Sequence, residues 1–549
     1  MDLNNIKRNQ LDYILTDMLP TELSERFTFF YFYEFLMTKR KELKQMNNFL
    51  ISVKNKYKTG IMFEGGGSGH GGHKGNNWVT MPLKYSIMKE LHTEREISLL
   101  QPIAAVELFA FVSTYQKELI NLLDMNSIFS LRHHHKNNEL CYKNKNKSIT
   151  KYFAVESAQI DKDLIEKTGM FFDIKPYKSI ASFTSSEEWL VLNSKYRYFI
   201  RTDYKACFDS IYTHTFKWLI GKDVNDTKDF KNTNIYTTID RILQNINART
   251  SNGIVVGPEF SRMIAEILLQ AIDRTVYSKL LNSGKTVGEN YNVYRFVDDI
   301  FIFAESEELA NEIVQIYSEI SAKYLLRLNE GKLYKNTVPF VLDEWINETS
   351  IFANRTSACL FRTKEEQEIW LQKEKQNSPE KEVVPHILKS RALYYSKRSI
   401  MNQLNEIICE YPSKDRTIVA YFLGTILNKV SRNKENVKIF SEHVTEQTVA
   451  NFMDLIFYAY SFFPNYNNTQ RFLSIVSYIR DEYDIFTSSE QLQKLVNKYA
   501  FIFLFFRFIY FFSCIYSHLR FFICCITALW FTHKFLNDIL YLRKRLLCV

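Results

Sequence analysis

Residues 294–303 read YRFVDDIFIF, two apolar runs that meet at a pair of adjacent acids, Asp298 and Asp299. Short runs rich in Phe and Ile predict strands, and two such runs joined by polar residues predict a β-hairpin with the acids at its tip. Neighbouring carboxylates repel each other unless water solvates them or a cation lies between them. Taken alone, such a pair is more often a solvated turn than a metal site, so other segments have to decide.

A third acid ends an earlier extended run. Residues 198–203 read YFIRTD, and a helical stretch follows Asp203. An acid at the end of a strand beside the hairpin tip would give three converging carboxylates. Mg²⁺ takes a few protein carboxylates and completes its shell with water and phosphates. Two such ions can activate a 3′-hydroxyl and stabilise a leaving pyrophosphate. The three aspartates therefore predict a two-metal nucleotidyltransferase site.

Two further segments flank this site in the sequence. Residues 253–262 read GIVVGPEFSR, and the apolar residues from Phe260 to Ile272 recur at helical spacing. Gly257 allows a close approach of the backbone, although a generic Gly-Pro helix start explains the segment equally well. After the hairpin, an amphipathic helix is predicted from Leu309 to Ile320. It precedes Lys332, which is either a solvated surface charge or, in a polymerase, a group that protonates the departing pyrophosphate.

In this order the four segments resemble motifs A to D of reverse transcriptases. Asp203 with residues 208–214 resembles motif A, residues 253–261 motif B, residues 296–299 motif C and residues 328–332 motif D. The resemblance implies an α+β fold with a fingers–palm core of the right-hand polymerase kind. Val255 departs from it, because many relatives have proline there, and Phe296 replaces the commoner residues of motif C. No thumb is recognisable.

The resemblance also implies roles for individual residues. Asp203 and Asp298 would bind both catalytic metals, and Asp299 would complete the acidic cluster. Lys332 would be the acid near the leaving group. The implied cofactor is a pair of Mg²⁺ ions, for which Mn²⁺ can substitute.

The nucleotide pocket is implied in the same way. Phe208 would exclude a 2′-hydroxyl and so select dNTPs, and Val256 and Gly257 would line the pocket. Arg132 is either a fingers residue that contacts the triphosphate or a surface arginine.

A narrower resemblance concerns residues 210–214 with Trp218, residues 177–180 with Trp189, and the long helical C-terminal half. These resemble bacterial abortive-infection and defence-associated reverse transcriptases. The resemblance implies a cytoplasmic enzyme of antiphage defence with dNTPs and RNA or DNA, including a non-coding RNA, as partners, and a homo-oligomer. Synthesis would be RNA-directed or template-independent, with a protein hydroxyl as one primer. The alternatives are a retron or mobile-element enzyme and, in another class, an inactive palm that serves as a binding scaffold.

The expected domain organisation is as follows: a mainly helical N-terminal region over 1–125 with a Gly-rich loop at 65–75, a fingers–palm core over 126–345, an all-α, α-solenoid-like or thumb domain over 346–500, and a hydrophobic tail over 501–549. A charged linker is expected over 364–382. The Gly-rich loop holds seven of the sixteen glycines, and we leave it without a function.

The composition of the chain excludes few classes of function. The net charge is +9, but six basic residues and one acid follow residue 500, so the rest of the chain is only slightly basic. The eight cysteines form no CxxC pair and predict reduced thiols, and the N-terminus lacks the pattern of a secretory signal. Residues 501–531 are strongly apolar. They predict a buried or interface helix, a membrane-associated tail, or an out-of-frame translation.

Overall fold

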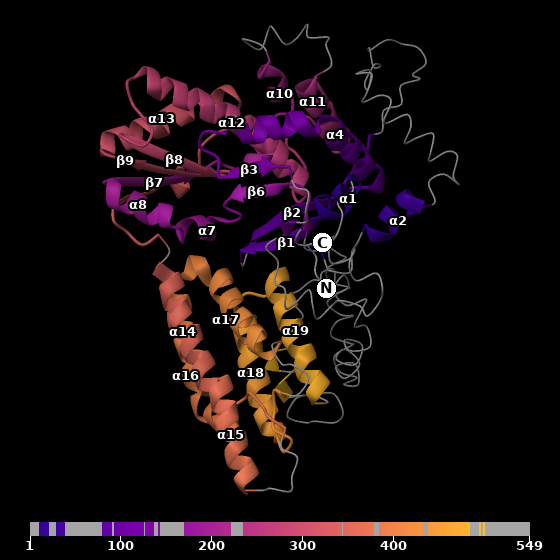
Figure 1. Cartoon of the computed structure of the whole chain (residues 1–549), viewed down its shortest axis with the longest axis vertical. Coiled ribbons are helices and arrows are strands. Elements are labelled where there is room, and N and C mark those ends of the chain that lie inside the picture. Colours follow the sequence, from indigo (N-terminus) through magenta and orange to yellow (C-terminus); the bar gives the residue numbers. More distant parts are fainter. Residues whose placement is uncertain are drawn as a thin grey trace, which may run out of the picture. The chain divides into compact units, whose positions relative to one another are not determined.

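The computed structural model of the chain (Figure 1) describes these residues: 10–20, 23, 29–38, 79–90, 93–125, 127–136, 141–142, 169–220, 234–342, 344–377, 384–431, 437–483, 494–495 and 498–499. The Gly-rich loop and the apolar tail lie outside them. The chain divides into two compact units, which are Met1–Ser86 with Glu96–Lys145 and Ala154–Val341, and Ile87–Arg95 with Asn146–Phe153 and Leu342–Val549.

The first unit is an α+β structure, in agreement with the predicted fold class. Its strands are β3 (Arg132–His135), β4 (Cys141–Tyr142), β5 (Gly169–Met170), β6 (Asp173–Pro176), β7 (Tyr198–Asp203), β8 (Tyr291–Phe296), β9 (Asp299–Ala304) and β10 (Tyr334–Thr337). Its helices are α1 (Asp12–Thr16), α2 (Phe30–Thr38), α4 (Pro102–Ile120), the π-helix η2 (Asn121–Met125), α7 (Ile180–Thr184), α8 (Glu187–Lys195), α9 (Cys207–Ser210), α10 (Thr215–Trp218), α11 (Ile235–Asn245), α12 (Glu259–Asn282), α13 (Glu307–Lys323) and the 3₁₀ turn η3 (Glu330–Lys332).

The main sheet has four antiparallel strands in the order β10-β7-β9-β8. Side chains of a strand alternate between the two faces of a sheet. Ile300 and Ile302 of β9 belong to the same apolar core as α12 and α13. Phe301 and Phe303 point the other way and contact the ring of Trp189 on α8. Helices α12 and α13 lie on one side of the sheet and α7 and α8 on the other (Figure 1). Since both faces are covered, the residues of β9 after Asp299 are all apolar.

The structure confirms the elements predicted around the acids. The hairpin is β8 and β9, Asp203 ends β7, and the two predicted amphipathic helices are α12 and α13. In the N-terminal region, α4 lies within a stretch predicted as helical. The two-stranded sheet of β1 (Leu83–Glu90) and β2 (Thr93–Leu99) was not predicted there.

The described part of the second unit is mostly helical. Its helices are α14 (Glu344–Leu360), α15 (Lys364–Asn377), α16 (Ser390–Glu410), the 3₁₀ turn η4 (Pro412–Lys414), α17 (Asp415–Val430), α18 (Glu446–Phe462) and α19 (Tyr466–Glu482). They enclose an apolar core of their own, with Phe352 and Phe422 stacked at 5.5 Å between ring centroids. An α-solenoid arrangement of these helices stays a prediction.

The expected linker over 364–382 was wrong for its first part, because residues 364–377 form helix α15. Thr363 and Glu366 explain the helix start. The amide of Glu366 donates to Oγ1 of Thr363 at 3.2 Å, and the amide of Thr363 donates to the Glu366 carboxylate at 2.9 Å. This is a capping box, and the Glu, Lys and Gln residues that follow are good helix formers.

No helix in the described part of the chain is long and apolar enough to cross a membrane.

Candidate active site

The pairing of β7 with β9 brings the predicted acids together. Asp203 and Asp299 are direct partners in this antiparallel pair, so their side chains lie on the same face of the sheet. Asp298 lies in the turn that joins β8 to β9. Burial, together with the charges of Asp299 and Asp203, raises the pKa of Asp298 to about 6. The three carboxylates therefore form one electrostatically coupled cluster.

The hairpin turn has an unusual backbone. Val297 has a φ of 57°, in the left-handed region that β-branched residues rarely adopt. The guanidinium of Arg295 donates to the carbonyl oxygen of Val297 at 2.8 Å. Strained backbone of this kind persists where the surroundings hold it, and it is common at functional sites. Arg295 thus holds the turn that presents Asp298.

The side chain of Arg295 is itself held by two acids of helix α12. Its side chain is fully buried and donates to Glu266 at 2.8 and 3.0 Å and to Asp273 at 2.7 and 2.8 Å. Both acids come from α12, one on each of two turns. The hydroxyl of Tyr317 on α13 also donates to Asp273, at 3.0 Å. Burial opposes ionisation of Glu266, but Arg295 outweighs it and lowers the pKa of that carboxyl.

Two cations face the acidic cluster. Nζ of Lys332 lies 2.7 Å from Oδ2 of Asp203, and this hydrogen bond is the main cause that raises the Lys332 pKa. The guanidinium of Arg201 lies 2.9 Å from Oδ1 of Asp299. The backbone positions Lys332, because the amide of Asn329 donates to the carbonyl oxygen of Asp203 at 2.8 Å. The structure thus brings Lys332 to the acids, as the sequence analysis expected if it serves the reaction.

The cluster has the donor chemistry of a divalent-cation site. Oδ1 of Asp203 is buried and accepts no hydrogen bond from any residue that the structure describes. A buried oxygen without a donor is costly unless another partner satisfies it. Two magnesium-type ions would neutralise the carboxylates and occupy this free oxygen. The chemistry of these carboxylates therefore suits divalent ions, and the binding of a metal pair here stays a prediction.

The predicted nucleotide-pocket residues lie on two segments that are joined by their backbones. Phe208 is half-buried on α9, and its carbonyl oxygen accepts from the amide of Ile254 at 2.9 Å. Val256 is half-buried, and its carbonyl accepts from Ser98 at 2.8 Å. Gly257 has a φ of 129°, and a Cβ there would lie 2.7 Å from Cγ of Pro20. The predicted close approach at Gly257 is confirmed, and the partner is protein.

The interpretation of Arg132 as a surface arginine was wrong. This residue is buried rather than on the surface, and its guanidinium pairs with Glu259 and lies 5.4 Å from the ring centroid of Phe296. Burial opposes ionisation of Glu259, but Arg132 and Arg262 outweigh it and lower its pKa to about 2. Arg132 therefore joins β3 to the hairpin and to the start of α12. Contact with a triphosphate stays a prediction, and it would require Glu259 to give up this partner.

Two arginines were not predicted from the sequence: Arg201, which pairs with Asp299, and Arg295, which pairs with two acids on α12. Strand alternation was the available signal for Arg201, because residues 201 and 203 share a face of β7. Glu266 and Asp273 lie seven residues apart within an apolar helix face, where unpaired acids are rarely tolerated. A basic partner on a neighbouring strand could have been expected from that spacing.

Residues 138–350 match the model of a protein family described as "Reverse transcriptase (RNA-dependent DNA polymerase)". The chain contains a reverse transcriptase domain. The matched residues include Asp203, Asp298, Asp299 and Lys332. No curated protein is similar enough to match the chain.

Solved telomerase structures from two Candida species are similar at low scores. Apo telomerase from Candida tropicalis is 11% identical with a TM-score of 0.31, and the comparison covers 83% of this chain and 70% of that one. Telomerase from Candida albicans in complex with a TWJ fragment of telomeric RNA is 12% identical with a TM-score of 0.26, over 82% and 68%. A C-terminally truncated apo telomerase from Candida tropicalis is 14% identical with a TM-score of 0.22, over 30% of this chain and 36% of that one. The reverse transcriptase domain rests on the family match and on the site, not on these low scores.

Proposed function

We propose that the chain is a DNA polymerase that extends a 3′-hydroxyl with dNTPs at Asp203, Asp298 and Asp299. The proximity of three carboxylates supports this proposal, since one of them has a buried oxygen that no described residue hydrogen-bonds. The position of the three aspartates within the reverse transcriptase domain also supports it.

The chain's own residues divide the work of the reaction. Asp203, Asp298 and Asp299 would hold two divalent ions, which when bound activate the 3′-hydroxyl and stabilise the leaving pyrophosphate. Lys332 is protonated, since its hydrogen bond to Asp203 raises its pKa, and it can neutralise the pyrophosphate or protonate it as the P–O bond breaks. Arg201 steadies Asp299 through a 2.9 Å contact. Phe208, Val256 and Gly257 would form the wall against which the sugar of the dNTP lies.

The enzymatic proposal can be tested with the full chain purified together with the nucleic acid that accompanies it. Incorporation of labelled dNTPs with Mg²⁺ is expected for the wild type and not for Asp298→Asn/Asp299→Asn. The matched control is Glu307→Gln/Glu308→Gln, a second pair of adjacent acids that is exposed at the start of α13. Equal incorporation by wild type and the aspartate variant would refute the proposal and favour a palm that acts as a scaffold.

We further propose that this polymerase serves antiphage defence. The proposal rests on the resemblance of residues 177–180 and 210–214, with Trp189 and Trp218, to defence-associated reverse transcriptases. A bacterium that carries the wild-type chain is expected to reduce phage plating, and Asp298→Asn/Asp299→Asn is expected to restore it. Protection that survives this change would separate defence from polymerisation.

The template and primer are two open parts of the proposal. Sequencing of the product would distinguish a copy of an RNA from untemplated DNA. A product whose mobility changes after protease treatment would be attached to a protein hydroxyl. A product that is unchanged by protease would exclude protein priming.

A further inference from the structure

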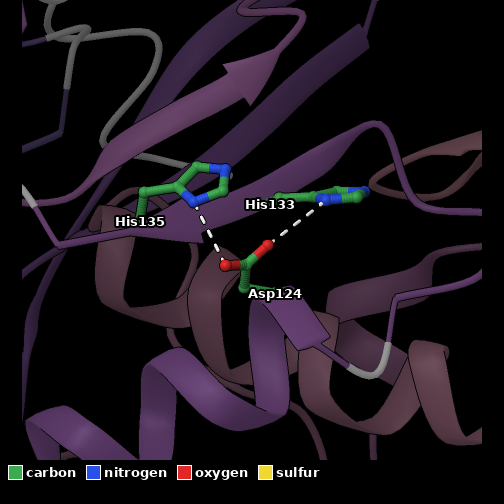
Figure 2. Close-up of side chains that lie close together, drawn as sticks. All are labelled: Asp124, His133 and His135. Carbon is green, nitrogen blue, oxygen red and sulfur yellow. Dashed lines mark ion pairs between the residues drawn. The ribbon is translucent and has the colours of Figure 1, made fainter.

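A second cluster of metal-ligand side chains lies away from the three aspartates. Among the described residues, Asp124, His133 and His135 each offer one ligand atom, and these atoms lie within 4.8 Å of one another. Figure 2 shows both histidine rings beside the Asp124 carboxylate. All three residues precede the segment 138–350 that the family model matches.

Two different elements supply these residues. His133 and His135 alternate with buried Arg132 and His134 along β3, so the two rings share the outer face of that strand. Asp124 comes from η2, a π-helix that continues α4. Turns of π-helix are rare in proteins, and those that occur often lie at functional sites.

The contacts within the cluster are close on both sides of the carboxylate. Nδ1 of His135 lies 3.1 Å from Oδ2 of Asp124, and Nδ1 of His133 lies 3.6 Å from Oδ1 (Figure 2). An ion about 2.0 to 2.2 Å from each ligand holds its ligand atoms within roughly 4 Å of one another. Small side-chain rotations would therefore bring the cluster to metal-binding geometry.

The orientation of His133 gives an independent indication of a cation. Nε2 of His133 lies 2.8 Å from the carbonyl oxygen of Ser130. A carbonyl oxygen only accepts, so Nε2 carries the proton and donates it. Nδ1 is then the ring nitrogen that is directed to the Asp124 carboxylate, 3.6 Å from Oδ1. A metal ion bound between them would have a nitrogen and an oxygen ligand that already face each other.

The same hydrogen bond is the one that metal-bound histidines usually make. A ligating imidazole commonly donates its second N–H to a backbone carbonyl, which fixes the ring. The segment that carries Ser130 is itself fixed by its backbone, because the amide of Leu131 donates to the carbonyl oxygen of Arg295 at 2.8 Å and the amide of Arg295 donates to that of Phe129 at 2.7 Å. The ring of His133 is thus held in place before any ion binds.

The donor set selects the kind of metal. Two imidazole nitrogens and one carboxylate suit Zn²⁺ and similar transition-metal ions, whereas Mg²⁺ prefers oxygen ligands alone. Asp173 is the strand partner of His135, and its carboxylate lies 2.9 Å from Nζ of Lys175. The carboxylate of Asp124, in contrast, contacts both rings. The three side chains are 28–36% exposed, which leaves room for water as a further ligand.

We propose that Asp124, His133 and His135 bind one transition-metal ion of the Zn²⁺ class, separate from the ions of the polymerase site. The ion ties η2 to β3, two elements that the contacts of Asp124 with His133 and His135 also join. It stabilises the fold and takes no part in nucleotide transfer.

The test is calorimetric titration of the chelator-treated full chain with Zn²⁺ in a large excess of Mg²⁺, which keeps the aspartate cluster occupied. One Zn²⁺ equivalent is expected to bind to the wild type. His135→Gln and Asp124→Asn are each expected to weaken this binding by more than about 100-fold, since even partners outside the metal shell cost about 10- to 100-fold. His443→Gln, a change of an exposed histidine in the second unit, is expected to leave it unchanged.

A second measurement keeps the proposal testable if a variant fails to fold. Wild-type chain loaded with Cu²⁺ should show hyperfine coupling to two imidazole nitrogens by electron paramagnetic resonance. The same signal should persist in His70→Gln/His73→Gln, which removes the two histidines of the Gly-rich loop. Loss of the signal in that variant, or the absence of Zn²⁺ binding by the wild type, would overturn the assignment.

Discussion

Arg295 donates a 2.8 Å hydrogen bond to the carbonyl oxygen of Val297, and so a fully buried arginine holds the turn that carries Asp298. The same guanidinium pairs with Glu266 and Asp273 on α12. The hairpin and the longest helix of the reverse transcriptase domain are therefore connected through one side chain. This side chain links the stability of the fold to the geometry of the site.

Replacement of Arg295 by methionine should lower the free energy of unfolding by about 3–5 kcal/mol, because two acids would remain buried without a cation. Urea denaturation measures this change. Arg197→Met is the control, since Arg197 is exposed in the same unit. A loss of less than about 1 kcal/mol for Arg295→Met would show that the buried pairs contribute little.

Replacement of Lys332 by leucine should lower kcat for dNTP incorporation by about 100-fold, the usual range for loss of a general acid. The KM for dNTP should change little, because the lysine contacts Asp203 rather than the bases. Lys335→Leu is the matched control, as Lys335 is exposed on β10 and bonds to Asn311. Equal rates for the two variants would exclude Lys332 from proton transfer.

Replacement of Phe208 by alanine should admit ribonucleotides. The ratio of kcat/KM for dNTP to that for rNTP is expected to fall by more than about tenfold, as for other changes of pocket shape. Incorporation of dNTPs by the same variant serves as the internal control. If the ratio is unchanged, another residue excludes the 2′-hydroxyl.

The pairing of Asp240 with His214 and Lys217 should make part of the stability depend on pH. Burial opposes ionisation of Asp240, but His214 at 2.9 Å and Lys217 at 2.6 Å outweigh it and lower its pKa to about 2. A carboxylate with a lowered folded-state pKa stabilises the fold above its unfolded pKa near 4, and this contribution is lost as the pH falls toward 2.

A fall of the Asp240 pKa from its usual value near 4 to about 2 corresponds to about 2 kcal/mol of stability near neutral pH. Asp240→Asn, which does not titrate, should therefore be less stable than the wild type at pH 6. The wild type's advantage in free energy of unfolding over Asp240→Asn should be about half as large at pH 3 as at pH 6. A difference that stays constant over this range would contradict the role of the Asp240 charge.

The sequence was informative where local pattern and chemistry coincide. The apolar runs on either side of Asp298 and Asp299 predicted the hairpin, and the helical spacing after Gly257 predicted α12. Arg295 stayed hidden, because a charged residue in an alternating strand is ordinarily expected to face water. Only the pairing of β8 with β9 and the approach of α12 reveal that it faces the core.

Other features of the structure were not predicted, in most cases because they depend on contacts between residues distant in sequence. Lys332 could be assigned to the site from motif order, but its bond to Asp203 spans 129 residues. Residues 364–377 were read as a linker because they are charged, although Thr363 and Glu366 form a helix-start signal that local inspection could have found. The cluster of Asp124, His133 and His135 depends on how a π-helix meets a strand, which no sequence spacing specifies.

The direct pairing of Asp203 with Asp299 has a consequence for how this site can change. Their separation is set by the ladder of backbone hydrogen bonds between β7 and β9, which places direct partners about 4.5 to 5.5 Å apart at their Cα atoms. Side chains along a strand alternate with a period of two, so one residue inserted between Asp299 and Ile300 would turn Asp299 to the opposite face if the rest of β9 kept its pairing. Loops around the site can vary in length, whereas the length of these two strands cannot. The relative position of Asp203 and Asp299 is thus unaffected by insertions outside β7 and β9.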